Sequence, residues 1–327
     1  MRFLFVYLFI QKIIAIFAAV AIFRQMKKAI VKIPNVEEEL RIGYSFNYMI
    51  KVIAETEAAE TVQWDFADVT FLHPFFLAPL AIYKNTSGRD IECINMPLRI
   101  QSYLNSICFD RMLHFDNEER EVVEMVMQKY IDKTYLPLCS FAMTDSNKDT
   151  FGSIMKTILL KQTKIGKGGS TSLSYLISEL LDNIYEHSQS PNGYVFSQYL
   201  ENEGMINLCI ADTGITVAGS FEKAGLYQKE IDGSETEALK LANEGYSTKN
   251  RPEAENRGYG ISTSKAMLVT GMKGAFFMLS GGAFHRYENG ANDYIDLKKL
   301  FQWRGTIILM RIPIILPDDF NYIDYLE

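Results

Sequence analysis

Four polar residues near the middle of the chain have the spacing needed to act together. Glu179, Asp182, Asn183 and Glu186 stand at positions i, i+3, i+4 and i+7. On a helix all four side chains would therefore lie along one face. Three carboxylates and an amide repel one another unless a cation or a hydrogen-bond donor lies among them. The stripe is therefore either a site for a cation or donor, or a solvent-facing helix surface.

A second stripe on the same segment predicts the helix itself. Apolar residues recur with the i, i+3, i+4, i+7 spacing of a helix that buries one side; they are Leu173, Leu176, Ile177, Leu180 and Ile184. Before them, Gly166, Gly168 and Gly169 predict a break between this helix and another at 151–164. The segment 145–149 is polar, and we expect it to be a loop.

A carboxylate downstream stands at the end of a predicted strand. The segments 194–200 and 205–211 predict a β-hairpin around Glu201-Asn-Glu-Gly204, and the second strand runs directly into Asp212-Thr-Gly214. An aspartate there can accept a hydrogen bond from the amino group of adenine, whereas guanine would leave the carboxylate unpaired. Taken alone, the same pattern is also typical of an ordinary turn.

A long polar segment separates this strand from a glycine pair. Residues 218–256 are rich in polar residues and glycine, contain one predicted helix at 235–243, and have the length of a mobile lid. Arg257-Gly258-Tyr-Gly260 then opens an apolar helix. Glycines let backbone N–H groups approach phosphate, and a helix N-terminus favours anions. A lone GxG pair is more often a turn than a nucleotide loop.

These signals occur together and in one order. The order is a helix with ExxxN, a strand ending in DxG, a lid with Ser-Thr-Lys249, GxG before a helix, and Gly-Thr306 before the closing strand at 307–314. Together they resemble the GHKL ATPases of the Bergerat fold, the family of gyrase-type topoisomerases, MutL, chaperones and histidine kinases. The resemblance covers about residues 136–315, within a domain that we place at 136–317. It implies a mixed sheet with helices on one face.

The resemblance also implies a role for each matching residue, with ATP and Mg²⁺ as cofactors. Asn183 would coordinate Mg²⁺, Asp212 would read adenine, Gly214 would leave room for the base, and Thr306 would support Asp212 through water. Nucleotide binding would further involve Thr248, Lys249, Arg257, Gly258 and Gly260, with Lys249 near the terminal phosphate. Glu179, one turn before Asn183, matches the general base of the hydrolysing and Ser/Thr-kinase branches.

Three functions are compatible with this resemblance. The first is a lid-gated regulatory protein that hydrolyses ATP. The second is a protein Ser/Thr kinase of the anti-sigma-factor type, and the third is an ATP-dependent binding module without catalysis. Because one fold serves many functions, fold alone does not choose among them.

The first part of the chain predicts a separate α/β domain at 27–115. Strands at 61–66 and 91–95 alternate with helices at 75–83 and 97–106. Trp64 to Leu72, Gly88 to Ile94 and Leu104 to Met112 resemble a STAS domain, which implies binding of a protein partner or of a second copy of the chain. Where that family carries a phosphorylatable hydroxyl, this sequence reads His73-Pro-Phe-Phe, so the usual phosphorylation is not expected. A connector helix is expected at 116–135.

Composition limits the remaining possibilities. The length of 327 residues suggests two domains, and the net charge of −7 gives no indication of nucleic-acid binding. Four cysteines without a CxxC pair fit reduced thiols in the cytoplasm. Residues 1–25 allow two interpretations. The apolar stretch 3–23 followed by Arg24 and Lys27 is typical of a membrane anchor that tethers the protein to the inner membrane face, whereas Met26 is a plausible true start.

Overall fold

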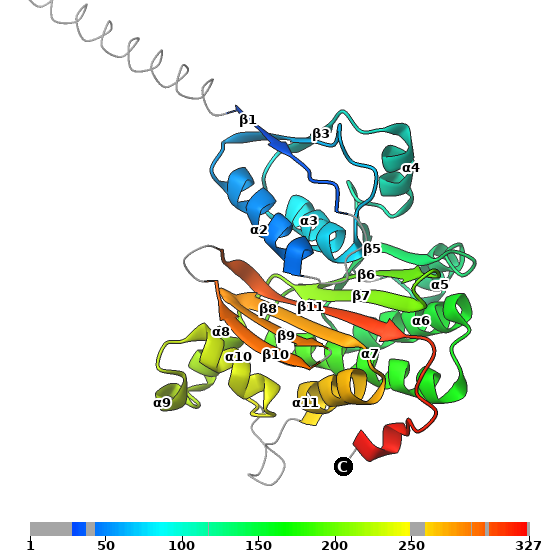
Figure 1. Ribbon diagram of the computed structural model, residues 1–327, viewed down its shortest axis with the longest axis vertical. Coiled ribbons are helices and arrows are strands. Elements are labelled where there is room, and N and C mark those ends of the chain that lie inside the picture. Colours follow the sequence, from blue (N-terminus) through cyan, green and yellow to red (C-terminus); the bar gives the residue numbers. More distant parts are fainter. Residues whose placement is uncertain are drawn as a thin grey trace, which may run out of the picture.

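The computed structural model describes residues 28–36, 43–116, 118–248, 259–288, 290–297 and 301–325. The fold is α/β, as the sequence predicts, with one small parallel sheet and one larger mixed sheet. Figure 1 shows four layers: the small sheet, two helices beneath it, the large sheet, and a second layer of helices on its far face.

The small sheet has the strand order β1-β2-β3, with all strands parallel. Its strands are β1 (Lys28–Lys32), β2 (Thr61–Asp65) and β3 (Ile91–Ile94), joined by helices α2 (Gly43–Glu57) and α3 (Pro74–Thr86) and followed by α4 (Leu98–Ser106). Parallel neighbours need such crossovers. Trp64 in β2 is fully buried, and its indole N–H donates to Thr56 of α2 at 2.9 Å, which fixes that helix against the sheet.

The large sheet has the order β10-β9-β8-β11-β7-β6-β5-β4 and is antiparallel except for the β4–β5 pair. Its strands are β4 (Leu113–Phe115), β5 (Tyr135–Ala142), β6 (Asn192–Leu200), β7 (Met205–Asp212), β8 (Ala275–Gly281), β9 (Ala283–Glu288), β10 (Ala291–Asp296) and β11 (Trp303–Pro313). β4 lies in the stretch that the sequence assigns to the first domain, yet it forms an edge of this sheet.

Helices cover one face of the large sheet. They are α5 (Arg120–Gln128), α6 (Asp145–Thr163), α7 (Lys167–His187) and α11 (Tyr259–Ala266), the last continuing into a π-helical turn (Met267–Gly271). The segment between β7 and α11 contains α8 (Val217–Ala224), α9 (Gln228–Ile231) and α10 (Glu235–Asn243). A 3₁₀ turn (Tyr322–Tyr325) ends the described chain. Because side chains alternate along strands, Ile210 and Ile308 point into this helix-covered core.

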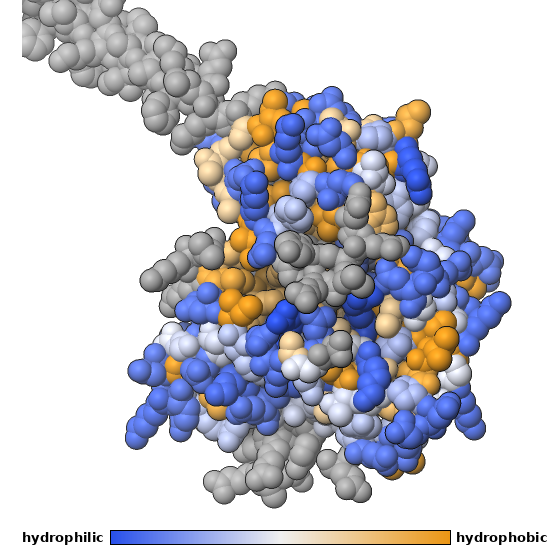
Figure 2. Space-filling model, in the orientation of Figure 1, coloured by the Kyte–Doolittle hydropathy of each residue, from blue (hydrophilic) through white to orange (hydrophobic). Residues whose placement is uncertain are grey.

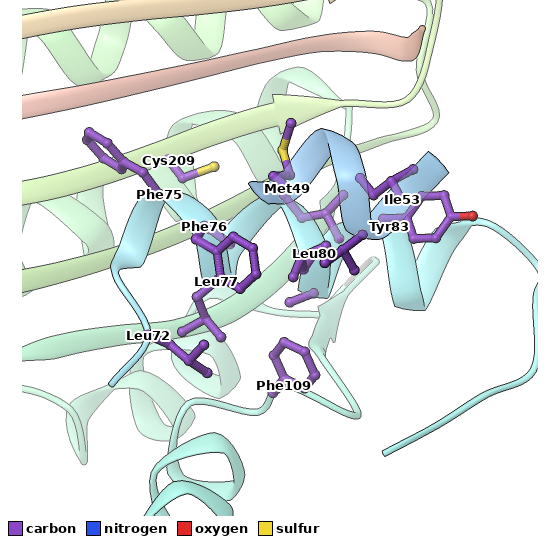
Figure 3. Close-up of a cluster of buried hydrophobic side chains, with 14 of the residues drawn as sticks. Met49, Ile53, Leu72, Phe75, Phe76, Leu77, Leu80, Tyr83, Phe109 and Cys209 are labelled. Carbon is purple, nitrogen blue, oxygen red and sulfur yellow. The ribbon is translucent and has the colours of Figure 1, made fainter. Parts of the chain in front are cut away.

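The opposite face of the large sheet is covered by the helices of the first domain. Because side chains alternate along strands, four residues from adjacent strands point toward this face and form a row. They are Phe277, Leu309, Cys209 and Phe196. All four belong to one buried cluster with α2 and α3. Figure 3 shows Phe75 at the start of α3 beside Cys209 of β7. The ring of Phe75 also meets that of Phe277 edge-on, with centroids 5.9 Å apart.

Some local expectations from the sequence are wrong. Residues 145–149 are not a loop, because Thr144 caps α6 and starts the helix at Asp145. Gly168 and Gly169 lie inside α7, so the break between the two helices is confined to Lys164 to Gly166. In the described part of the lid segment there are three helices rather than the single predicted one, although α10 matches its predicted bounds. Helix α2 was not predicted from the sequence.

Figure 2 shows a hydrophilic surface over α8, α9 and α10, in keeping with the polar composition of this segment. Within the described ranges, none of the helices has the length and apolar character required to cross a membrane. The predicted anchor at 3–23 lies outside those ranges.

Candidate functional site

A cavity of about 580 Å³ opens between α7, α8, the segment after α10 and the start of α11. Six of the residues to which the resemblance assigns a catalytic or binding role line it: Glu179, Asn183, Asp212, Thr248, Gly260 and Thr306. They come from five separate stretches of the chain, and the helix-covered side of the sheet brings them together.

One end of the cavity is apolar and contains a buried carboxylate. Asp212 follows Ile210 by two residues, so strand alternation turns it toward α7, and only 1% of it is exposed. Its neighbours in the cavity wall include the buried side chains of Ile184, Met278 and Ile308. Burial raises the pKa of Asp212 to about 7, although backbone N–H groups of Gly214 and Thr306 counteract the shift by donating to the carboxylate. This end can recognise a flat, mostly apolar group that carries a hydrogen-bond donor.

The closing strand supports this carboxylate directly. Gly305 has a φ of +85°, and a Cβ there would overlap Asp212, so only glycine lets β11 approach so closely. The next residue, Thr306, donates its backbone N–H to Asp212. The expected support through water stays a prediction beside this direct contact.

Gly214 lies beside both Asp212 and the chain after α7, and its expected role of leaving room for the base stays a prediction. Its N–H donates to Asp212 Oδ1 at 2.8 Å. A Cβ at position 214 would overlap the backbone carbonyl of Ser188, which accepts the N–H of Ile215 at 2.7 Å. The glycine therefore makes room for the chain after α7 and holds it against the end of β7.

The polar stripe of α7 forms a second side of the cavity. Asn183 Nδ2 donates to the carbonyl of Glu179 at 2.7 Å, which leaves Asn183 Oδ1 available as an oxygen ligand. Gly260 packs against this pair, since a Cβ at position 260 would overlap Oε2 of Glu179. The side chain of Glu179 therefore lies beside the first turn of α11.

The other two carboxylates of the stripe, Asp182 and Glu186, each have a basic side chain nearby. Lys148 of α6 forms an ion pair with Asp182. Burial acts to lower the pKa of Lys148, but the hydrogen bond to Asp182 and nearby carboxylates outweigh it and raise the pKa. Glu186 lies 3.9 Å from His187 Nε2. All four residues of the stripe line the cavity, with Asp182 held by Lys148 and with Glu179 and Asn183 beside Gly260.

Two polar residues that the sequence did not single out, His187 and Ser220, also line the cavity, and both contact Thr248. His187 Nδ1 lies 2.9 Å from the hydroxyl of Thr248, which is 3.2 Å from the hydroxyl of Ser220 in α8. These contacts tie the segment after α10 to the end of α7. The helical period offered a signal, because His187 lies four residues after Asn183.

Lys249, Arg257 and Gly258, which the sequence assigns to nucleotide binding, lie outside the described residues. Within the described part of the chain there is no cluster of three or more His, Cys, Asp or Glu side chains arranged to hold a metal ion. Asn183 and Glu179 offer two oxygen ligands beside the first turn of α11. That number fits Mg²⁺ in phosphate sites, where water and the phosphates complete the coordination.

Comparison with known proteins gives no assignment: no family model matches the chain, and no curated protein matches it.

Proposed function

We propose that the protein binds ATP with Mg²⁺ in this cavity and hydrolyses it as a GHKL-type regulatory ATPase. The observation that supports this most strongly is the position of Asp212, a buried acceptor at the apolar end of the same cavity that contains Glu179 and Asn183. A base with a donor amino group fits the first end, and charged phosphates fit the second.

The side chains of α7 suggest how the reaction would proceed. Asn183 Oδ1 would hold the metal, which when bound neutralises phosphate charge. Glu179 would orient the attacking water and accept its proton. Its position beside the first turn of α11 fits this role, since backbone N–H groups at a helix N-terminus favour phosphate.

The first domain is proposed to be STAS-like and to stabilise and regulate the second. The position at which STAS domains carry their switch hydroxyl is occupied by His73, which caps α3 by accepting the N–H of Phe75 at 3.2 Å. His73 is 1% exposed, and burial, followed by the charge of Arg311, lowers its pKa to about 4. A buried neutral capping residue favours a structural role over phosphotransfer. Protein partners would then bind at surfaces other than the start of α3.

Two functions are alternatives to ATP hydrolysis. An anti-sigma-type Ser/Thr kinase would use the same Glu179 and Asn183, and a non-catalytic module would use the cavity for binding alone. A cytoplasmic location is proposed with each of them, because all four cysteines are free thiols and two, Cys139 and Cys209, are buried.

One experiment separates these functions. Purified full-length protein is incubated with γ-labelled ATP and Mg²⁺, and both free phosphate and labelled protein are followed over time. Free phosphate without labelled protein supports hydrolysis. Label transferred to this chain or to an added partner supports the kinase, and ATP binding without either product supports the binding module. Absence of ATP binding by calorimetry would refute all three.

A further inference from the structure

Ser280 in β8 lies behind the apolar end of the cavity and contacts three residues of two other elements, α8 and β11. It is 2% exposed. Its hydroxyl oxygen accepts the N–H of Val217, the first residue of α8, at 2.9 Å. The same hydroxyl lies 3.3 Å from the carbonyl of Gly305 and 2.9 Å from the hydroxyl of Thr306.

The number of protons available shows which group donates in each of these hydrogen bonds. The hydroxyl of Ser280 has one proton and two lone pairs. The Gly305 carbonyl can only accept, so the Ser280 proton satisfies it. Ser280 must then accept the proton of Thr306, and its second lone pair takes the N–H of Val217. In the opposite arrangement, two acceptor oxygens of Ser280 and Gly305 would lie 3.3 Å apart without a proton between them.

This direction determines what Thr306 presents to the cavity. Thr306 lines the cavity beside Asp212. With its only proton donated to Ser280, its hydroxyl has just lone pairs left for a ligand. Two acceptors, the threonine hydroxyl and the ionised carboxylate, then lie together at the apolar end. A ligand with an amino group at this place is favoured over one with a carbonyl.

We infer that Ser280 is a positioning residue that sets the base selectivity of the cavity, by holding the Thr306 hydroxyl as an acceptor and the β11 backbone against Asp212. The inference rests on the proposed nucleotide function and deepens it. Ser280 acts through Thr306 and is not assigned a contact with the ligand.

The test compares ATP with GTP, both with Mg²⁺, on full-length wild type and Ser280→Ala by calorimetry. In the variant, the Thr306 proton can turn into the cavity and donate to a carbonyl. We expect the preference for ATP over GTP to fall roughly five- to tenfold, the scale of one hydrogen bond. An unchanged preference would overturn the inference.

A matched control comes from the same sheet. Ser197 in β6 is fully buried, and its hydroxyl has no hydrogen-bond partner among the residues that the structure describes. Ser197→Ala therefore removes the same group from a comparable environment, and the preference should stay at the wild-type value. If Ser197→Ala reduces it as much as Ser280→Ala does, the effect is one of general packing and the inference fails.

A double-mutant cycle tests the route through Thr306. If Ser280 acts on Thr306, Ser280→Ala should have little further effect on selectivity in a Thr306→Val background. Additive effects would show that the route is wrong.

One readout does not depend on nucleotide. The pKa of Asp212 can be measured by NMR of its labelled carboxyl carbon. Loosening Thr306 weakens a backbone N–H bond that lowers this pKa, so Ser280→Ala should raise it. If the wild type binds neither nucleotide, the proposed function fails, and this titration alone decides whether Ser280 positions β11: an unchanged pKa rejects it.

Discussion

At the scale of single residues, Glu179 and Asp212 carry the two halves of the proposed chemistry. Their environments are opposite. Glu179 is partly exposed and lies beside a helix start, whereas Asp212 is 1% exposed in an apolar end of the cavity. Solvent access suits a base that handles water, and burial suits a group that recognises a ligand atom by hydrogen bonding.

Glu179→Gln tests the catalytic half. Glutamine keeps the volume and the hydrogen-bonding ability of the side chain but cannot accept the proton of water. ATP turnover measured by phosphate release should fall roughly 10²-fold or more. ATP affinity measured by calorimetry should stay the same or rise, because one negative charge near the phosphates is removed. Turnover at the wild-type rate would exclude Glu179 as the base.

The raised pKa of Asp212 predicts pH dependence in two observables. With a pKa of about 7 in the folded protein against 3.8 unfolded, the carboxyl contributes stability that is fully present below pH 3.8. This contribution is lost as pH rises through about 7. Recognition of an amino group needs the ionised form, so ATP affinity should change in the opposite sense and fall as pH drops below about 7.

Asp212→Asn provides the control for both effects. The variant has no titrating group at this site. Its free energy of unfolding, measured by chemical denaturation at several pH values, should therefore lack the decrease between about pH 4 and 7 that Asp212 causes in the wild type. Its ATP affinity should be weaker by about 1–3 kcal/mol, because a donor now faces the amino group. If the wild type and the variant show the same pH profile of ATP binding, Asp212 does not contact the ligand.

At the scale of secondary-structure elements, the position of α11 against α7 decides whether the site can form. Gly260 permits this approach, and the missing side chain is replaced by the carboxylate of Glu179. The contact between α11 and α7 therefore determines where the side chain of the proposed base, Glu179, can lie.

Gly260→Ala should displace Glu179 more than it disturbs the fold. The added methyl group meets the flexible end of a side chain, which can move at small cost. We expect a larger fall in ATP turnover than in ATP affinity. Gly168→Ala in α7 is the comparison, since a Cβ there meets nothing within 4 Å and alanine favours the helix by up to about 1 kcal/mol. Equal loss of turnover in both variants would contradict this explanation.

At the scale of the whole molecule, the two parts of the chain share a core. The helices α2 and α3 lie between the two sheets, and one buried cluster runs through all three layers. In α3 every residue from Pro74 to Tyr83 is buried, because one side of the helix faces the small sheet and the other faces the large one. The first domain is therefore a structural layer of the complete fold.

Phe75→Ala should destabilise the whole protein. Removing a fully buried ring that contacts Phe277 typically costs about 3–5 kcal/mol. Because the cluster is continuous, chemical denaturation followed by tryptophan fluorescence and by circular dichroism should show a single shifted transition. Leu98→Ala, at a residue 83% exposed, should leave the transition unchanged. Two separate transitions in the Phe75 variant would mean that the domains fold independently.

Local patterns in the sequence predicted most features that belong to a single helix or strand. The stripes of α7, the end of β7 at Asp212 and the bounds of α10 follow from helical and strand periodicity and from turn residues. These features depend on neighbours within a few residues, so they can be predicted without knowledge of the tertiary structure. The same patterns failed at 145–149, where the cap at Thr144 outweighs the polar composition that suggested a loop.

The tertiary structure decided how these elements meet. The burial of α3 on both sides depends on the large sheet, whose strands β6, β7, β8 and β11 lie more than 100 residues further along the chain. The contacts of Ser280 with Val217 and Thr306 join residues 63 and 26 positions apart. Sequence periodicity carries no information about such distances, because they are set by strand order and register. The acceptor character of the cavity's apolar end is therefore a property of the assembled sheet.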